Sequence, residues 1–63
     1  MTQKELLYFE DAIGHESNVI KIVKNNIDSL MDENLKEFME EELSKHKNLK
    51  EKLLNLLGEK ANG

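Results

Sequence analysis

The sequence contains no cysteine and no proline, and only three glycines are spread over its 63 residues. Without cysteine, the chain forms neither a disulfide nor a thiolate metal site, a composition that suits a reducing cytoplasm. Without proline, long helices can run uninterrupted. A chain this short rarely gains more than about 3–5 kcal/mol from a single core, so it usually needs a staple. Self-association is therefore the expected source of additional buried surface.

Arginine is also absent, since all nine basic residues are lysine, and the formal net charge is −4. Bidentate contacts to phosphate and guanine favour arginine, and no basic patch with interleaved aromatic residues occurs, so we expect no nucleic-acid partner. No apolar run approaches the roughly 20 residues of a membrane span, and no signal-peptide pattern is found. The sequence thus predicts a soluble, cytoplasmic protein with no membrane partner.

Apolar residues spaced alternately three and four apart predict a first helix over about residues 3–30. Thr2 followed by Glu5 predicts a capping box at its start, in which each side chain bonds the backbone amide of the other residue. Gly14 lies inside the segment, and the sequence leaves open whether it kinks the helix. The apolar stripe consists of Leu6, Phe9, Ile13, Glu16, Ile20, Val23, Ile27 and Leu30, widened on one side by Ala12 and Val19.

Turn-forming residues at about positions 31–33 separate this helix from a second helix expected over about residues 33–57. Asp32 is the predicted N-cap of the second helix. Gly58 is its predicted stop signal, and residues 58–63 are expected to fray. The second stripe consists of Leu35, Met39, Glu42, His46, Leu49, Leu53 and Leu56, flanked by Phe38, Leu43 and Leu57.

Two long amphipathic helices joined by a short turn predict an antiparallel hairpin, and hence one all-α domain over residues 1–63. The charge pattern agrees, because the acidic start of each helix then faces the more basic end of the other. The alternative is one continuous coiled-coil helix, which has to run through Asp32, Glu33 and Asn34. A lone hairpin leaves part of each stripe in water. We therefore expect two hairpins to pair as a homodimeric four-helix bundle.

Three polar residues, Glu16, Glu42 and His46, interrupt the two apolar stripes. Folding the hairpin about its turn brings Glu16 level with His46 and leaves Glu42 one helical turn nearer the loop. Isolated carboxylates inside a bundle are costly, so they are expected to be neutralised, paired with His46, hydrated or bound to a cation. A structural network that fixes register and a metal site both stay open.

This arrangement resembles the ferritin-like proteins, whose di-iron or di-manganese sites take one Glu from each of two helices and a Glu–His pair from each of the others. Glu16 resembles the single Glu. Glu42 and His46 resemble the pair, although they are four residues apart where the family has three. The resemblance implies iron or manganese held across a homodimer by Glu16, Glu42 and His46.

In whole-chain layout the sequence resembles the spore coat F-like (coat F domain) family, small ferritin-like helical proteins of endospore-forming bacteria. The segment MTQKELLYFEDAI resembles the first helix of that family, and DENLKEFMEEELSKHKNL resembles the second. The resemblance implies a two-helix half of a ferritin-like bundle with a spore-associated location.

No nucleophile constellation and no glycine-rich phosphate loop occurs, which favours a non-enzymatic role. We expect a small self-associating helical protein with a structural or interaction function, and the family resemblance implies association with a spore coat. The alternative is a minimal ferritin-like metal-binding protein formed across the homodimer. A third hypothesis is a hairpin that binds another protein through Leu7, Tyr8 and Ile22, which lie outside the stripe.

Overall fold

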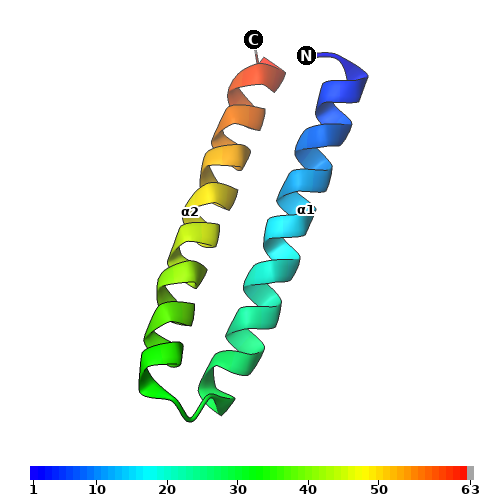
Figure 1. Ribbon diagram of the computed structural model, residues 1–63. Helices are drawn as coiled ribbons and strands as arrows, with labels where there is room; N and C mark the ends of the chain where they lie inside the picture. Colours follow the sequence, from blue (N-terminus) through cyan, green and yellow to red (C-terminus); the bar gives the residue numbers. More distant parts are fainter. Residues whose placement is uncertain (63) are drawn as a thin grey trace.

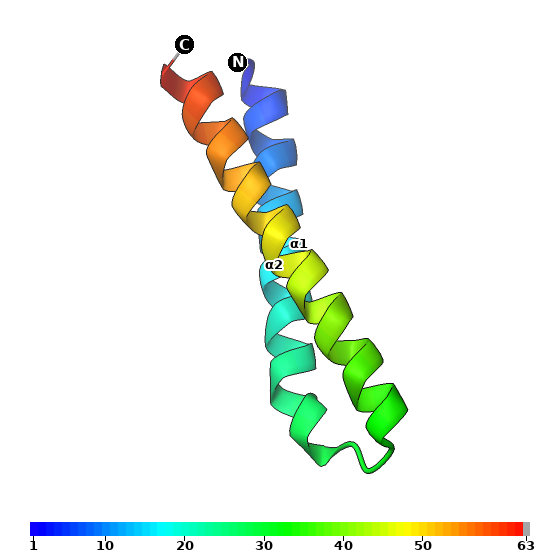
Figure 2. The same ribbon diagram turned by 90° about the vertical axis from the view of Figure 1, so that its left-hand side faces the viewer.

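Two long helices joined by a short turn form the structure, a computed structural model that describes residues 1–62 (Figure 1). Helix α1 spans Gln3–Asn26, the short 3₁₀ turn η1 spans Ile27–Ser29, and α2 spans Glu33–Asn62. α1 begins and α2 ends at the end of the hairpin opposite the turn. The view turned by 90° shows the two helices crossing obliquely (Figure 2). The predicted all-α hairpin is confirmed, and the described residues contain no strand.

The start of α1 is held by the predicted capping box. The backbone N–H of Glu5 donates to Thr2 Oγ1 at 3.1 Å, and the backbone N–H of Thr2 donates to Glu5 Oε1 at 2.9 Å. These two bonds satisfy amides that have no partner within the helix. A local sequence pattern therefore determines where the first helix begins.

The α-helix α1 ends at Asn26 and the chain continues as η1 to Ser29, so the helical segment ends close to the predicted residue 30. The Asn26 side chain donates to the carbonyl of Ile22 at 2.6 Å, and Ser29 Oγ donates to the carbonyl of Asn26 at 2.7 Å. Short polar side chains that bond nearby carbonyls compete with the helical ladder. The chain tightens into η1, and Leu30 then adopts an extended conformation with φ −74° and ψ 131°.

Asp32 starts the second helix, as predicted. The backbone N–H of Leu35 donates to Asp32 Oδ1 at 3.0 Å, and the N–H of Lys36 donates to the Asp32 carbonyl at 2.9 Å. The side-chain bond is that of an N-cap residue, and the backbone bond is the first of the helical ladder. The turn that separates the helices is therefore specified locally.

α2 does not stop at Gly58 as predicted but continues to Asn62, while Gly63 lies outside the described residues. A glycine ends a helix when it adopts the left-handed conformation, and no described glycine has a positive φ. Glu59, Lys60 and Ala61 are good helix formers, so the helix continues past Gly58. Gly14 likewise leaves α1 uninterrupted.

The hairpin is long and thin, with extents of 46 × 15 × 11 Å. Its radius of gyration is 14.6 Å, whereas a globular chain of this length has about 11 Å. The interior is correspondingly small, because only Ile27 and Glu16 are buried among residues 1–61.

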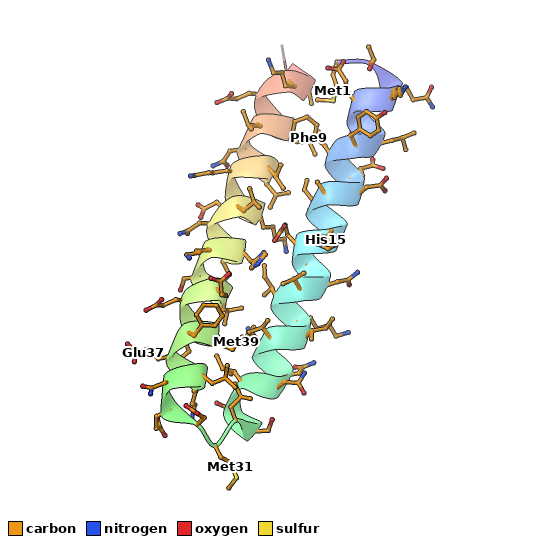
Figure 3. The ribbon with its side chains drawn as sticks, viewed as in Figure 1. Met1, Phe9, His15, Met31, Glu37 and Met39 are labelled. Atoms are coloured by element: carbon orange, nitrogen blue, oxygen red, sulfur yellow. The ribbon has the colours of Figure 1, made fainter. Side chains whose placement is uncertain are left out.

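α2 is rotated about its own axis relative to the predicted stripe. Leu35, Leu49 and Leu56 belong to that stripe but are 46%, 43% and 44% exposed. Leu43 and Leu57, predicted to flank it, are half-buried instead. One partner helix covers only part of a wide apolar stripe, and α1 covers the Leu43 side. Figure 3 shows Phe9 and Met39 directed between the helices, and Glu37 directed away from α1.

Candidate functional site

Glu16 and His46 meet at the middle of the hairpin, one from each helix. The Nδ1–H of His46 donates to Glu16 Oε2. The Glu16 side chain is 9% exposed and the His46 side chain is 30% exposed. The prediction that these two residues lie level with each other is confirmed. The bond joins a nearly buried carboxylate of α1 to an imidazole of α2 that is open to solvent on one side.

This bond reports the register of the two helices. With Glu16 opposite His46, each step toward the loop on α1 matches one step toward the loop on α2. Val23 therefore lies level with Met39, and these two side chains line one groove near the turn. A slip by one helical turn would separate the Glu16 carboxylate from its His46 donor, and in one direction would bring it level with Glu42. The pair thus favours one register over its neighbours.

No buried side-chain polar atom lacks a hydrogen-bond partner in the part of the chain that the structure describes. Glu16 is therefore compatible with the interior because His46 supplies a donor. The bond through Nδ1 also orients the imidazole ring and leaves Nε2 as its other nitrogen. A carboxylate that holds a histidine in this way is common behind metal-binding and proton-transferring histidines.

Glu42 does not join this pair within one chain. Its Oε1 accepts a hydrogen bond from Lys45 Nζ at 3.2 Å, and the Glu42 side chain is 31% exposed. Across residues 1–62 of a single hairpin, no three Asp, Glu or His side chains gather as a metal-binding group. The predicted site of Glu16, Glu42 and His46 was placed across two chains, so iron or manganese binding stays a prediction.

A groove of about 310 Å³ lies beside the turn, and the sequence analysis did not predict it. Both helices and the turn contribute to it. The rotation of α2 creates it by moving Leu35 toward solvent. Ile22 was the signal in the sequence, because it is a large apolar residue outside the predicted stripe. The groove is lined by Ile22, Val23, Asn26, Ile27, Leu30, Leu35 and Met39.

The groove is one end of an apolar surface that follows the hairpin. Ile22 and Leu35 line the groove together, so they lie on the same side of the molecule. Leu49 and Leu56 follow Leu35 by whole heptads, and Tyr8 precedes Ile22 by two heptads, so they extend the same side along packed helices. We call this surface the open face and define it by Tyr8, Val19, Ile22, Leu35, Phe38, Leu49 and Leu56.

The residues predicted to bind another protein divide between two sides of α1. Leu7, Tyr8 and Ile22 are 52%, 59% and 62% exposed. Tyr8 and Ile22 belong to the open face, whereas Leu7 points about 100° away from Tyr8 around the helix. Lys4 Nζ lies 5.9 Å from the centroid of the Tyr8 ring. In Figure 3 His15, which is one heptad from both Tyr8 and Ile22, lies over the α1 ribbon, so the view is onto the open face.

Neither described helix is long and apolar enough to cross a membrane. The chain matches no protein-family model, no curated protein sequence and no solved structure. The resemblance to ferritin-like and spore coat F-like proteins therefore rests on the sequence patterns alone and stays a prediction.

Proposed function

We propose that this chain is a self-associating helical module in which two hairpins pair through their open faces as a four-helix bundle. Its role is structural, as a building or bridging unit, and not catalytic. One observation carries the proposal. Eleven large apolar side chains are exposed in residues 1–61, whereas Ile27 is the only apolar residue there that is buried.

The exposed area supports association quantitatively. The hairpin exposes 5046 Å², whereas a globular chain of its mass exposes about 4,200 Å². The difference is about 850 Å², close to the roughly 800 Å² that each partner contributes to a standard protein–protein interface. A second hairpin on one face would cover an area of about this size.

Sedimentation equilibrium tests this proposal. We expect the wild-type protein to sediment at twice its monomer mass of 7.3 kDa at micromolar concentration. The helical content, measured by circular dichroism, should fall together with the dimer as the sample is diluted. A stably folded monomer at micromolar concentration would contradict self-association.

The resemblance to the spore coat F-like family extends the proposal to a structural role in a spore layer. A different protein that offers two amphipathic helices would satisfy the same apolar surface. A second copy and a different protein are distinguishable as partners, because a chain that pairs only with another protein would remain monomeric when purified alone.

Metal binding across the dimer is a second candidate function, and the buried Glu16–His46 pair favours it. Pairing two hairpins would place two such pairs and two Glu42 carboxylates in one assembly. Titration of the dimer with Mn²⁺ or anaerobic Fe²⁺, followed by calorimetry, tests this candidate. We expect saturable binding that His46→Ala abolishes. Absence of binding by the wild-type dimer would rule out the metal site and leave self-association unaffected.

A further inference from the structure

Taking the proposed self-association as its basis, we propose that the second copy docks on the open face in the opposite direction, with its turn beside the chain ends of the first. The two-fold axis then runs perpendicular to the helices. It passes at the level of His15 on α1 and Lys47 on α2, one residue from the Glu16–His46 pair.

The two sides of the hairpin differ in composition at equivalent positions. On the open face the outermost positions of the helices are Tyr8, His15 and Ile22 on α1 and Phe38, Lys45 and Lys52 on α2, so three of the six carry large apolar residues. On the opposite side the matching positions are almost all polar, with Leu54 the exception. These positions are Gln3, Glu10, Ser17 and Lys24 on α1, and Glu33, Glu40, Lys47 and Leu54 on α2.

The opposed orientation matches two pairs of apolar open-face residues, one pair on each helix. Tyr8 and Ile22 lie equally far on either side of His15, so Tyr8 of one copy meets Ile22 of the other. Phe38 and Leu56 lie equally far on either side of Lys47, so they also meet across the axis. Two-fold symmetry makes each contact twice. The groove beside the turn thereby receives Tyr8 and Leu56 of the second copy.

The charges decide between the two orientations that a two-fold axis allows. In the opposed orientation, Glu42 of one copy lies opposite Lys52 of the other, because both are five residues from Lys47. With both turns at the same end, Glu42 would instead lie at the level of Ile20, between Val19 and Ile22 of the second copy. That position would desolvate the Glu42–Lys45 ion pair against apolar side chains, whereas the opposed orientation adds a second cation beside Glu42.

Disulfide cross-linking tests the orientation, because the natural chain contains no cysteine. In Phe38→Cys/Leu56→Cys the two thiols are about 27 Å apart along one helix, so they cannot bond within one chain. We expect a covalent dimer under oxidising conditions. Tyr8→Cys/Ile22→Cys, with thiols about 21 Å apart on α1, should also give a covalent dimer. It provides an independent answer if the first variant fails to fold.

Two controls make the outcome decisive. Leu7→Cys/Leu54→Cys places thiols at residues that are 52% and 47% exposed but lie away from the open face, so no covalent dimer should form. Cross-linking of Ile22→Cys/Phe38→Cys into dimers, with none from the two test pairs, would show both turns at the same end and overturn the proposal. A wild-type monomer in sedimentation would instead overturn the proposed function itself.

The choice of face has its own matched test. Phe38 and Leu54 are similarly exposed, at 54% and 47%, on opposite sides of the hairpin. Phe38→Glu should weaken dimerisation by more than about tenfold, because a carboxylate would be buried at the interface. Leu54→Glu should leave the dimerisation constant within about twofold, as expected for a solvent-exposed position. Equal effects of the two substitutions would contradict the open face as the interface.

Discussion

Glu16 is the one charged residue that is buried among residues 1–61, and its partner His46 explains how the hairpin tolerates it. The pair contributes more to the choice of helix register than to stability, because the interaction of a buried polar pair seldom exceeds the cost of desolvating its members. Replacing one member of the pair and replacing both members should therefore have opposite effects on the free energy of unfolding.

His46→Leu should destabilise the folded protein by about 1–3 kcal/mol, because the Glu16 carboxylate would be buried without its donor. Glu16→Leu/His46→Leu should recover that loss and exceed the stability of the wild type, since no polar group is then buried at the site. Urea unfolding at one fixed protein concentration measures both changes. A double variant much less stable than wild type would assign the pair a required role, such as holding a metal.

Glu5 makes a pH-dependent contribution to stability at the start of α1. The backbone amide of Thr2 and then its side chain bond the Glu5 carboxylate, and these bonds lower the pKa of Glu5 below its ordinary value. Because the folded-state pKa is the lower one, the contribution is fully present above the unfolded-state pKa. It is lost as the pH falls through the folded-state pKa.

Acid titration followed by NMR should therefore show the amide signals of Thr2 and Glu5 shifting together below the ordinary Glu pKa. Glu5→Gln should abolish this step, since glutamine can still complete the capping box but does not titrate. An unchanged titration of the Thr2 amide in Glu5→Gln would show that another group causes it.

At the scale of the elements, both helices begin at the residues that local capping signals predict. Their ends are determined by the structure around them. Thr2 and Asp32 act as predicted, because capping bonds join residues three apart in the chain. The end of α1 at Asn26 depends on the tight turn that has to join two packed helices. The rotation of α2 depends on which side of its stripe α1 covers.

Gly14→Ala tests whether glycine inside α1 serves a purpose. A Cβ at this position meets no atom within 4 Å, apart from the helix's own nearby backbone. Alanine should therefore stabilise the helix by about 1 kcal/mol, and raise the melting temperature by about 4–8 °C at this chain length. Thermal unfolding by circular dichroism measures the shift. A lower melting temperature would indicate that Gly14 contacts a second chain closely.

At the scale of the whole molecule, the thinness of the hairpin limits how much apolar surface it can bury. A pair of helices can bury one narrow strip, and the remaining apolar residues stay in water until another pair covers them. Under the proposed self-association, the hairpin and its partner surface are two parts of one folding unit. Stability should depend on protein concentration, as in dimers whose monomers are weakly folded.

The melting temperature should accordingly rise as the protein concentration increases from about 1 to 100 μM, following mass action for a dimer. Phe38→Glu should lower the melting temperature most at high concentration, where mass action stabilises the wild-type dimer most. Leu54→Glu, on the opposite side of the hairpin, serves as its control. A melting temperature independent of concentration would contradict unfolding coupled to dissociation.

The sequence by itself determined the all-α hairpin, both helix starts and the level of Glu16 with His46. These follow from apolar spacing, from capping bonds and from folding one stripe onto another about a short turn. Tertiary structure alone decided which side of the α2 stripe meets α1. It thereby separated Glu42 from Glu16 and His46 and moved Leu35 to the rim of a groove. The physical reason is that periodicity defines a stripe wider than one helix can cover, and only packing selects the covered part.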